Sequence, residues 1–335
     1  MLAITQHAHE PQDLTMAVLG CGTMGIAILS GILASLQQMS GPKPLQSPSG
    51  STPRDDVPSR LPSRFIACVR RPESAKRVKK ALWEHSASLK VVQNENVSAV
   101  SRSEVVLLSC KASMVEELLS EPGMAKALRG KLLISICAGI TTPHIEKILQ
   151  GAVPEQEQAP EDDKDNDGRC RVVLAMPATT SVIRESMTVI ATSMPPLPPQ
   201  ISSLVTWIFR RIGDVVYLPP TNMDASTALC GSGPAFFALV LEAAIDGAVA
   251  MGLPRAEATR MAAQTMRGTA SLVLSGEHPA MIRDKVTTPA GCTIGGLLVL
   301  EEGCVRGTVS RAVREATGVA SQLGQGIQGV NGTRR

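Results

Sequence analysis

The 335-residue chain has few aromatic residues and little excess charge. Aromatic residues make up 2% of it, and the formal net charge at pH 7 is only +3. Proteins that bind nucleic acid follow the phosphates with a basic surface and stack bases on aromatic rings. We therefore expect no nucleic acid among the partners of this protein.

The sequence also lacks paired cysteines and a targeting segment. Its eight cysteines are scattered, mostly in apolar runs, and no CxxC pair occurs. This pattern predicts reduced core thiols, with no disulfide and no metal site. No basic region followed by an apolar core opens the chain, and no uninterrupted apolar run reaches about 18 residues. We expect a cytoplasmic protein that does not enter a membrane.

Two segments contain too few apolar residues to form packed structure. The first, 40–64, is rich in Pro, Ser and Gly, and the second, 154–168, is strongly acidic. Such compositions cannot offset the entropy of ordering, so we predict two disordered insertions.

Outside these insertions, apolar runs typical of strands alternate with helical patterns up to about residue 220. The predicted strands are Leu14 to Gly20, Phe65 to Arg71, Leu89 to Val92, Glu104 to Cys110, Lys131 to Ile140, Cys170 to Met176, Met187 to Ser193 and Gly213 to Leu218. Strands separated by helices predict a parallel sheet covered on both faces. The fold class is α/β, with a Rossmann-type domain over 14–220.

The remainder, 221–325, is predicted to be an all-helical domain. The run from Met223 to Met251 is dominated by Ala, Leu, Val and Glu, apart from a Gly-Ser-Gly-Pro interruption. A helix with Phe236, Phe237 and Leu239 is too apolar all round to face water. We expect it to pack against its symmetry mate in a homodimer.

A GxGxxG motif formed by Gly20, Gly22 and Gly25 indicates a dinucleotide site. The first glycine ends a strand and the third lies in the first turn of a helix, which is the context that gives this motif meaning. The backbone there, including Thr23 and Met24, can approach a pyrophosphate at the helix N-terminus.

The expected form of the cofactor is NADP(H). An acidic residue at the end of the second strand would bind a ribose 2′-hydroxyl, whereas arginine binds a 2′-phosphate. The chain has Arg70 and Arg71 at that place. The spacing from Gly25 matches the expected one of about 20 residues once the insertion is subtracted.

The stretch VTTPAGCTIGGL, Val286 to Leu297, contains no ionisable side chain except Cys292. A Pro-Ala-Gly turn leading into a helix can offer backbone N–H groups to a carboxylate and a hydroxyl to a neighbouring nitrogen. A plain helix cap without a ligand is the simpler alternative.

With this stretch, several segments together resemble the Δ1-pyrroline-5-carboxylate reductases, which perform the last step of proline synthesis. AVLGCGTMGIAILSGIL is similar to the opening strand, turn and helix of that family, and VTTPAGCTIGGL to its signature. EVVLLSCK, LLISICAGIT and MDASTALCGSGPAFFALVLEAAIDGAVAMGL are similar to further family segments. The resemblance spans Leu14 to Leu323 outside the two insertions.

The resemblance implies a reaction and a set of site residues. NADPH would pass a hydride to the imine carbon of a cyclic imine carboxylate, 1-pyrroline-5-carboxylate. It implies that Thr288, Pro289, Ala290 and Gly291 cradle the substrate carboxylate and that Thr293 is the catalytic hydroxyl beside the imine nitrogen. It also implies Lys111 and Ala138 as cofactor-binding residues.

Three departures from the family pattern keep alternatives open. Ala178 stands where the family has an asparagine, Ala112 where it has a proline, and Ala290 where it has a second glycine. A reductase of a related, substituted cyclic imine and a non-catalytic NADP-binding paralogue are therefore weighed against the proline-forming enzyme.

Overall fold

The computed structural model describes residues 14–40, 57–152, 168–324 and 327. By contacts, the chain divides into two units, one of Met1–Gly231 with Ala320–Val330 and one of Ser232–Val319 with Asn331–Arg335. The predicted insertion at 154–168 falls outside the described residues except for Gly168, as does most of the insertion at 40–64.

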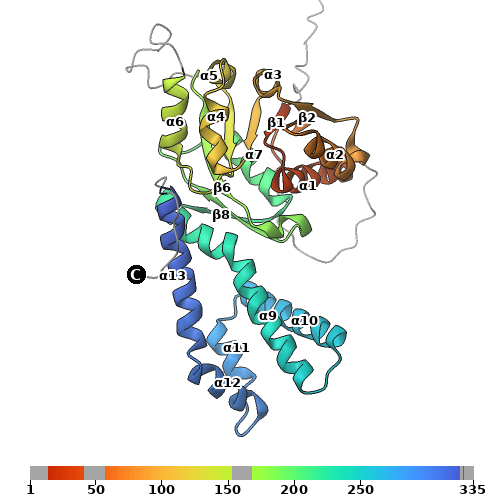
Figure 1. The fold of residues 1–335 in the computed structure, drawn as a ribbon, viewed down its shortest axis with the longest axis vertical. Helices are drawn as coiled ribbons and strands as arrows, with labels where there is room; N and C mark the ends of the chain where they lie inside the picture. Colours follow the sequence, from red (N-terminus) through yellow and green to blue (C-terminus); the bar gives the residue numbers. More distant parts are fainter. Residues whose placement is uncertain (1–13, 41–56, 153–167, 325–326, 328–335) are drawn as a thin grey trace, which may run out of the picture. The chain divides into compact units, whose positions relative to one another are not determined.

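The first unit is built on an eight-stranded sheet of order β3-β2-β1-β4-β5-β6-β7-β8 (Figure 1). Its strands are β1 Leu14–Leu19, β2 Pro62–Val69, β3 Leu89–Gln93, β4 Val105–Leu108, β5 Leu132–Ser135, β6 Arg171–Met176, β7 Ser186–Ala191 and β8 Gly213–Leu218. The expected α/β class is confirmed, and every predicted strand is present.

Helices connect these strands. They are α1 Thr23–Ser40, α2 Pro72–Ala81, α3 Asn96–Ser101, α4 Val115–Leu119, α5 Met124–Leu128, α6 Thr142–Gly151 and α7 Pro199–Arg210. Short helical turns are η1 Trp83–His85, η2 Ala112–Met114, η4 Thr179–Ile183 and η5 Pro220–Asn222.

The two faces of the sheet carry separate cores. Met16 and Val18 of β1 pack with residues of α1, α2 and α7, whereas Ala17 and Leu19 pack with residues of α3 to α6. Successive side chains of a strand point to opposite faces, so a strand covered on both faces is apolar at most positions. All six residues of β1 are buried, and all but Thr15 are apolar.

The prediction of a wholly parallel sheet is wrong at one pair of strands. β6 and β7 are antiparallel, while the other pairs are parallel. A parallel crossover needs about a dozen residues or more, usually with a helix. Only Pro177 to Glu185 separate β6 from β7, and they hold just the short turn η4.

The second strand begins earlier than predicted. The composition places residues 62–64 in the first insertion, but β2 starts at Pro62, which pairs with Leu14 of β1. Proline is tolerated at the first position of a strand, where the missing N–H costs little. A proline-rich composition therefore concealed the beginning of this strand.

The helical part follows β8. It comprises α8 Met223–Ser226, the π-helical turn η6 Thr227–Ser232, α9 Gly233–Ala250, α10 Arg255–Leu274, α11 Pro279–Lys285, α12 Cys292–Glu302 and α13 Val305–Gly324. The prediction of helices throughout this region is confirmed. The predicted helix over 223–251 is α8, a π turn and α9, because the Gly-Ser-Gly-Pro segment changes the hydrogen-bond pattern.

The second unit buries few apolar side chains. Ile245, Ala258 and Ile282 are its buried apolar residues among those described. Leu239 and Leu274, in contrast, are 67% and 80% exposed. Patches of exposed apolar residues rimmed by polar ones mark interaction surfaces.

One helical run, Pro220–Ala250, is long and apolar enough to cross a membrane by length and composition alone. The sequence reading expected no such segment, because it counted only uninterrupted apolar residues. A single helix of this kind is weak evidence for a membrane, since buried core helices and signal sequences pass the same test.

Candidate functional site

The glycine motif forms a tight turn between β1 and α1. Gly20 has φ +71°, and the Gly22 N–H lies 2.6 Å from the Gly20 carbonyl oxygen. A Cβ atom on Gly20 would lie 2.7 Å from the Cα atom of Cys110. Only glycine fits here, because both the dihedral angle and the contact exclude a side chain.

Gly22 and Gly25 differ in what surrounds them. A Cβ atom on Gly25 would lie 3.0 Å from Val18 and 3.1 Å from the Ser109 hydroxyl, so this glycine lets the helix pack closely on the strand. A Cβ atom on Gly22 would meet nothing closer than the Gly20 carbonyl oxygen at 3.7 Å. Open space at the second glycine is what the approach of a pyrophosphate requires.

The turn lies where the strand order reverses. β1 sits between β2 and β4, and the chain continues to opposite sides of the sheet from there. Ligands of open α/β sheets bind in the crevice at the carboxyl ends of the strands at such a switch point. Thr23 and Met24 open α1 at this edge.

The arginine pair lies at the same edge. Arg70 and Arg71 follow β2 directly, both are exposed, and Arg71 precedes the first residue of α2. The structure adds Arg77 of α2, whose guanidinium Nη2 would be 3.9 Å from a Cβ atom on Gly22. The sequence reading missed Arg77, although its place on the helix after the second strand could have identified it as a candidate.

Lys111 and Ala138 follow the ends of β4 and β5, and both are exposed. All the predicted cofactor-binding residues therefore lie beyond the carboxyl ends of β1, β2, β4 and β5. The sheet brings them to one edge because neighbouring parallel strands end side by side.

Ala178 follows β6 and is buried, with 3% exposure. Its N–H donates to the Ser186 hydroxyl at 2.9 Å, and its carbonyl accepts from the Ser181 hydroxyl at 2.5 Å. The Ser186 and Ser181 hydroxyls therefore hold the backbone at this position, although the chain lacks the asparagine side chain that the family has there.

The loop predicted to bind substrate belongs to the other unit. It joins α11 to α12, with Thr288, Pro289 and Ala290 exposed and Gly291 directly before α12. The Gly291 N–H donates to the Thr288 carbonyl at 3.1 Å, and a Cβ atom on Gly291 would meet the Thr288 hydroxyl. A side chain at position 291 would therefore require the Thr288 hydroxyl to move.

Ala290 adopts a left-handed conformation with φ +57°. An L-residue with a side chain pays roughly 1 to 2 kcal/mol for this conformation. With alanine in place of the family's glycine, the turn keeps its left-handed conformation and is strained.

The start of α12 offers unpaired polar groups. First-turn N–H groups of a helix have no intrahelical acceptor, which leaves the amides of Cys292 and Thr293 to other partners. Thr293 is half-buried, and its hydroxyl has no hydrogen-bond partner within the described parts of the chain. A carboxylate placed here would also meet the positive end of the helix dipole.

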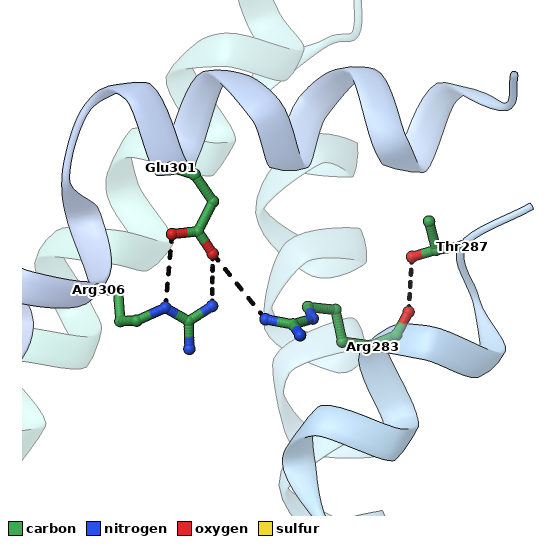
Figure 2. Close-up of polar contacts among 4 residues, drawn as sticks. All are labelled: Arg283, Thr287, Glu301 and Arg306. Atoms are coloured by element: carbon green, nitrogen blue, oxygen red, sulfur yellow. Dashed lines mark hydrogen bonds and ion pairs between the residues drawn. The ribbon is translucent and has the colours of Figure 1, made fainter. Parts of the chain in front are cut away.

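Ion pairs brace the helices on both sides of this loop (Figure 2). The Glu301 carboxylate of α12 pairs with Arg306 of α13 and lies 3.9 Å from Arg283 of α11. The hydrogen bond from Arg306, and then the nearby positive charges, lower the pKa of Glu301. Thr287 donates its hydroxyl to the Arg283 carbonyl at 2.6 Å, which closes the end of α11.

A cavity of about 620 Å³ lies away from these groups. Glu104, Lys131 and Arg171, at the amino ends of β4, β5 and β6, line it. The Lys131 ammonium donates to the Val100 and Ser101 carbonyls. This cavity is at the edge of the sheet opposite the glycine turn, so it is not the predicted dinucleotide site.

Two family models match the chain. The model described as "Pyrroline-5-carboxylate reductase dimerisation" matches residues 220–323, and "NADP oxidoreductase coenzyme F420-dependent" matches residues 15–139. The first covers the helical part of the chain, and the second covers the glycine turn and strands β1 to β5.

Curated relatives match almost the whole chain. A pyrroline-5-carboxylate reductase of Lophium arboricola is 64% identical over 98% of this chain and 98% of its own. One of Neurospora crassa is 56% identical over 96% of this chain and 97% of its own. Among solved structures, a pyrroline-5-carboxylate reductase from Coxiella burnetii superposes with a TM-score of 0.71 at 25% identity, covering 93% of this chain and 99% of that one.

Proposed function

Because this chain belongs to the pyrroline-5-carboxylate reductase family and reduces 1-pyrroline-5-carboxylate to proline with NAD(P)H, we propose which of its residues perform that reaction. The first unit holds the cofactor and the helical part holds the substrate and forms the dimer, with a division near residue 220. One observation carries the assignment of the cofactor site. Gly20 makes the tight turn, Gly22 leaves room for a pyrophosphate and Gly25 allows close packing of the helix on the strand, as a dinucleotide-binding turn requires.

The cofactor lies at the carboxyl edge of the sheet. The pyrophosphate sits against the turn from Gly20 to Gly25, including Thr23 and Met24, where Gly22 leaves room for it. The N-terminus of the 18-residue helix α1 then faces the phosphates. Lys111 and Ala138 border the same crevice from β4 and β5.

NADPH is the preferred form of the cofactor. Arg70, Arg71 and Arg77 surround the place where the adenosine ribose lies in a fold of this kind. The exposed guanidinium groups are free to turn toward a 2′-phosphate, which accepts strong charge-assisted hydrogen bonds. Arg77 is also close enough to Gly22 to reach the pyrophosphate.

The substrate carboxylate binds at the start of α12. Since the Gly291 amide already donates to Thr288, the amides offered are those of Ala290 and of the first turn of α12. Thr288 and Pro289 shape the turn that presents these groups.

Thr293 is the catalytic hydroxyl of this chain. When bound, NAD(P)H supplies the hydride that adds to the imine carbon. As that bond forms, the electron pair of the C=N bond moves onto the nitrogen, which then accepts hydrogen bonds more strongly. A hydroxyl already positioned there stabilises the transition state more than the ground state.

The helical part makes the enzyme a homodimer or a higher homo-oligomer. The exposed apolar residues of α9 and α12, and the match of 220–323 to a dimerisation model, support this assembly. We also place the enzyme in the cytoplasm, which the eight free thiols support.

One assay tests this assignment of function. NADPH oxidation is measured with 1-pyrroline-5-carboxylate, with substituted pyrroline carboxylates and with a six-membered imine carboxylate at equal concentrations. We expect the highest kcat/KM for 1-pyrroline-5-carboxylate. A tenfold preference for a substituted or six-membered imine would instead support the specialised reductase, and no turnover with any imine would support a non-catalytic role.

A further inference from the structure

Two cysteines meet at the cofactor edge without a role in hydride transfer. Cys110 follows β4 by two residues, and Cys137 follows β5 by two residues. Because Leu108 pairs with Ser135 in the parallel ladder, the same register places Cys110 opposite Cys137.

The Cys137 thiol lies against the backbone of Cys110. Its Sγ atom lies 3.3 Å from the Cys110 carbonyl oxygen and 3.5 Å from that of Leu108. The interaction between the two thiols is also the largest influence on the pKa of each. Neighbouring strands are about 4.8 Å apart, and disulfides span Cα separations of about 4.4 to 6.8 Å. The spacing of the two strands therefore lies within the range that a disulfide spans.

The two thiols differ in reactivity. Cys110 is partly exposed, and the hydrogen bond from the Cys137 thiol lowers its pKa. Cys137 is buried, and the same hydrogen bond, followed by burial, raises its pKa. Thiolates are the reactive species, so Cys110 is the group that an oxidant meets first.

Cys110 is also in direct contact with the glycine turn. A Cβ atom on Gly20 would lie 2.7 Å from both Cα and Cβ of Cys110. The preceding residue, Ser109, donates its N–H to the Leu19 carbonyl at 2.9 Å and directs its hydroxyl to the Leu19 and Gly20 carbonyls. A shift of the backbone at Cys110 must therefore displace the turn.

We propose that Cys110 and Cys137 form a reversible disulfide at the cofactor edge of the sheet, and that its formation weakens NADPH binding. The thiolate of Cys110 attacks hydrogen peroxide, forming Cys110–SOH and releasing hydroxide, which takes up a proton to become water. The Cys137 sulfur then attacks the Cys110 sulfur, its proton leaves with the hydroxyl group as a second water, and the S–S bond forms. Two electrons pass from the sulfur atoms to the peroxide, and an external dithiol reverses the change.

The effect on NADPH rests on the proposed cofactor role of the Gly20 turn, whereas the disulfide does not. Joining the sulfurs brings them to about 2.05 Å, which pulls the Cys110 side chain toward β5. Because Gly20 packs directly on the Cα and Cβ atoms of Cys110, this pull shifts the surface that supports the turn. We expect NADPH to bind at least fivefold more weakly to the oxidised enzyme.

Peptide mapping tests the disulfide. The full chain is treated with hydrogen peroxide, blocked with N-ethylmaleimide and digested with trypsin without reduction. Cys110 and Cys137 are each the single cysteine of the tryptic peptides 103–111 and 132–147. We expect these peptides joined, with a mass two hydrogens below their sum, and separated again by dithiothreitol. Both peptides carrying N-ethylmaleimide, or Cys110 joined to another cysteine, would overturn the proposal.

Matched cysteines provide the control. Cys21 and Cys68 are also near one another at this edge, but burial raises the pKa of each thiol to about 12, so no cross-link between them is expected. Cys110→Ser and Cys137→Ser should each lose the cross-link, while Cys170→Ser, on a partly buried thiol before β6 whose pKa is raised by burial, should keep it. Cross-linking that persists in Cys137→Ser contradicts the assigned pair.

The affinity for NADPH is then measured by nicotinamide fluorescence after the peroxide is removed. Oxidised wild type should bind at least fivefold more weakly and recover with dithiothreitol, and Cys137→Ser should not respond to peroxide. If the disulfide forms and the affinity for NADPH does not change, the proposed effect on NADPH binding is wrong. The role given to the Gly20 turn would then be wrong, while the assignment of the thiol pair would stand.

Discussion

Gly20 and Cys110 touch backbone to backbone, since a Cβ atom on Gly20 would lie 2.7 Å from the Cys110 Cα atom. This contact joins the end of β1 to the end of β4 at the point where the strand order reverses. The glycine turn therefore contributes to the packing of the sheet as well as to the proposed cofactor site. Substitutions at its different glycines should have different effects.

Gly20→Ala should destabilise the fold, and Gly22→Ala should not. The first adds a side chain at φ +71° against neighbouring backbone, a strain of about 1 to 3 kcal/mol before the clash is counted. The second places a methyl group in open space where the pyrophosphate is proposed to lie. Thermal unfolding should show a lower Tm for Gly20→Ala only, and NADPH titration should show at least tenfold weaker binding for Gly22→Ala. If Gly22→Ala and wild type bind NADPH with equal affinity, the pyrophosphate does not lie at this turn.

The arginines should determine the choice between NADPH and NADH. Replacing Arg70 and Arg71 by glutamine should raise KM for NADPH and leave KM for NADH nearly unchanged, because charge-assisted hydrogen bonds to the 2′-phosphate are worth roughly 1.5 to 3 kcal/mol. Arg77→Gln separates the two possible roles of that residue. If it reaches the pyrophosphate, it should weaken both cofactors, and if it binds only the 2′-phosphate, it should weaken NADPH alone.

Ala290 should tolerate glycine and reject valine. Glycine removes roughly 1 to 2 kcal/mol of left-handed strain and costs about 0.4 to 1 kcal/mol in the unfolded chain, so a small gain in Tm is expected. A β-branched side chain at φ +57° should lower Tm and raise KM for the imine. Equal Tm values for all three residues would show that the loop does not hold this conformation.

Thr293→Val should lower kcat about 100-fold, or roughly 2.7 kcal/mol, with NADPH binding close to wild type. Thr287 is not a neutral control, because its hydroxyl donates to the Arg283 carbonyl. Thr269 makes the same kind of bond to the Thr265 carbonyl at 3.0 Å, in α10. Thr287→Val therefore measures how much kcat falls when a helix hydroxyl beside the loop is lost. Thr269→Val measures the same effect for a hydroxyl away from the loop. If Thr293→Val behaves like either of these variants, its catalytic assignment is wrong.

Leu239→Asp should break the assembly. Leu239 is 67% exposed on α9, in a unit that buries few apolar side chains. A carboxylate buried in an interface is costly, so sedimentation should show monomers with lost activity. Trp83→Asp, at a side chain that is 68% exposed on the first unit, should leave the assembly intact. A dimeric Leu239→Asp enzyme would place the interface elsewhere.

The elements with the clearest sequence signals were those in which local chemistry and tertiary structure agree. Nearly continuous apolar runs such as Leu14 to Leu19 identify strands buried on both faces, because such strands occur where a parallel sheet is covered on both sides. The GxGxxG spacing identified the turn, since its geometry allows few residues other than glycine at Gly20. The family resemblance supplied the reaction, which the relatives confirm.

What the sequence determined by itself is therefore the α/β class, the glycine turn and the membership of a reductase family. Tertiary structure alone decided the antiparallel β6–β7 pair, the contact of Gly20 with Cys110, and the contact of the Cys137 thiol with the Cys110 carbonyl. It also brought Arg77 to Gly22 and gave Ala290 its positive φ. Most of these features depend on contacts between residues far apart in the chain, and the conformation of Ala290 depends on the helices on both sides of its turn. Strand order and packing determine such contacts, and no local sequence pattern encodes them.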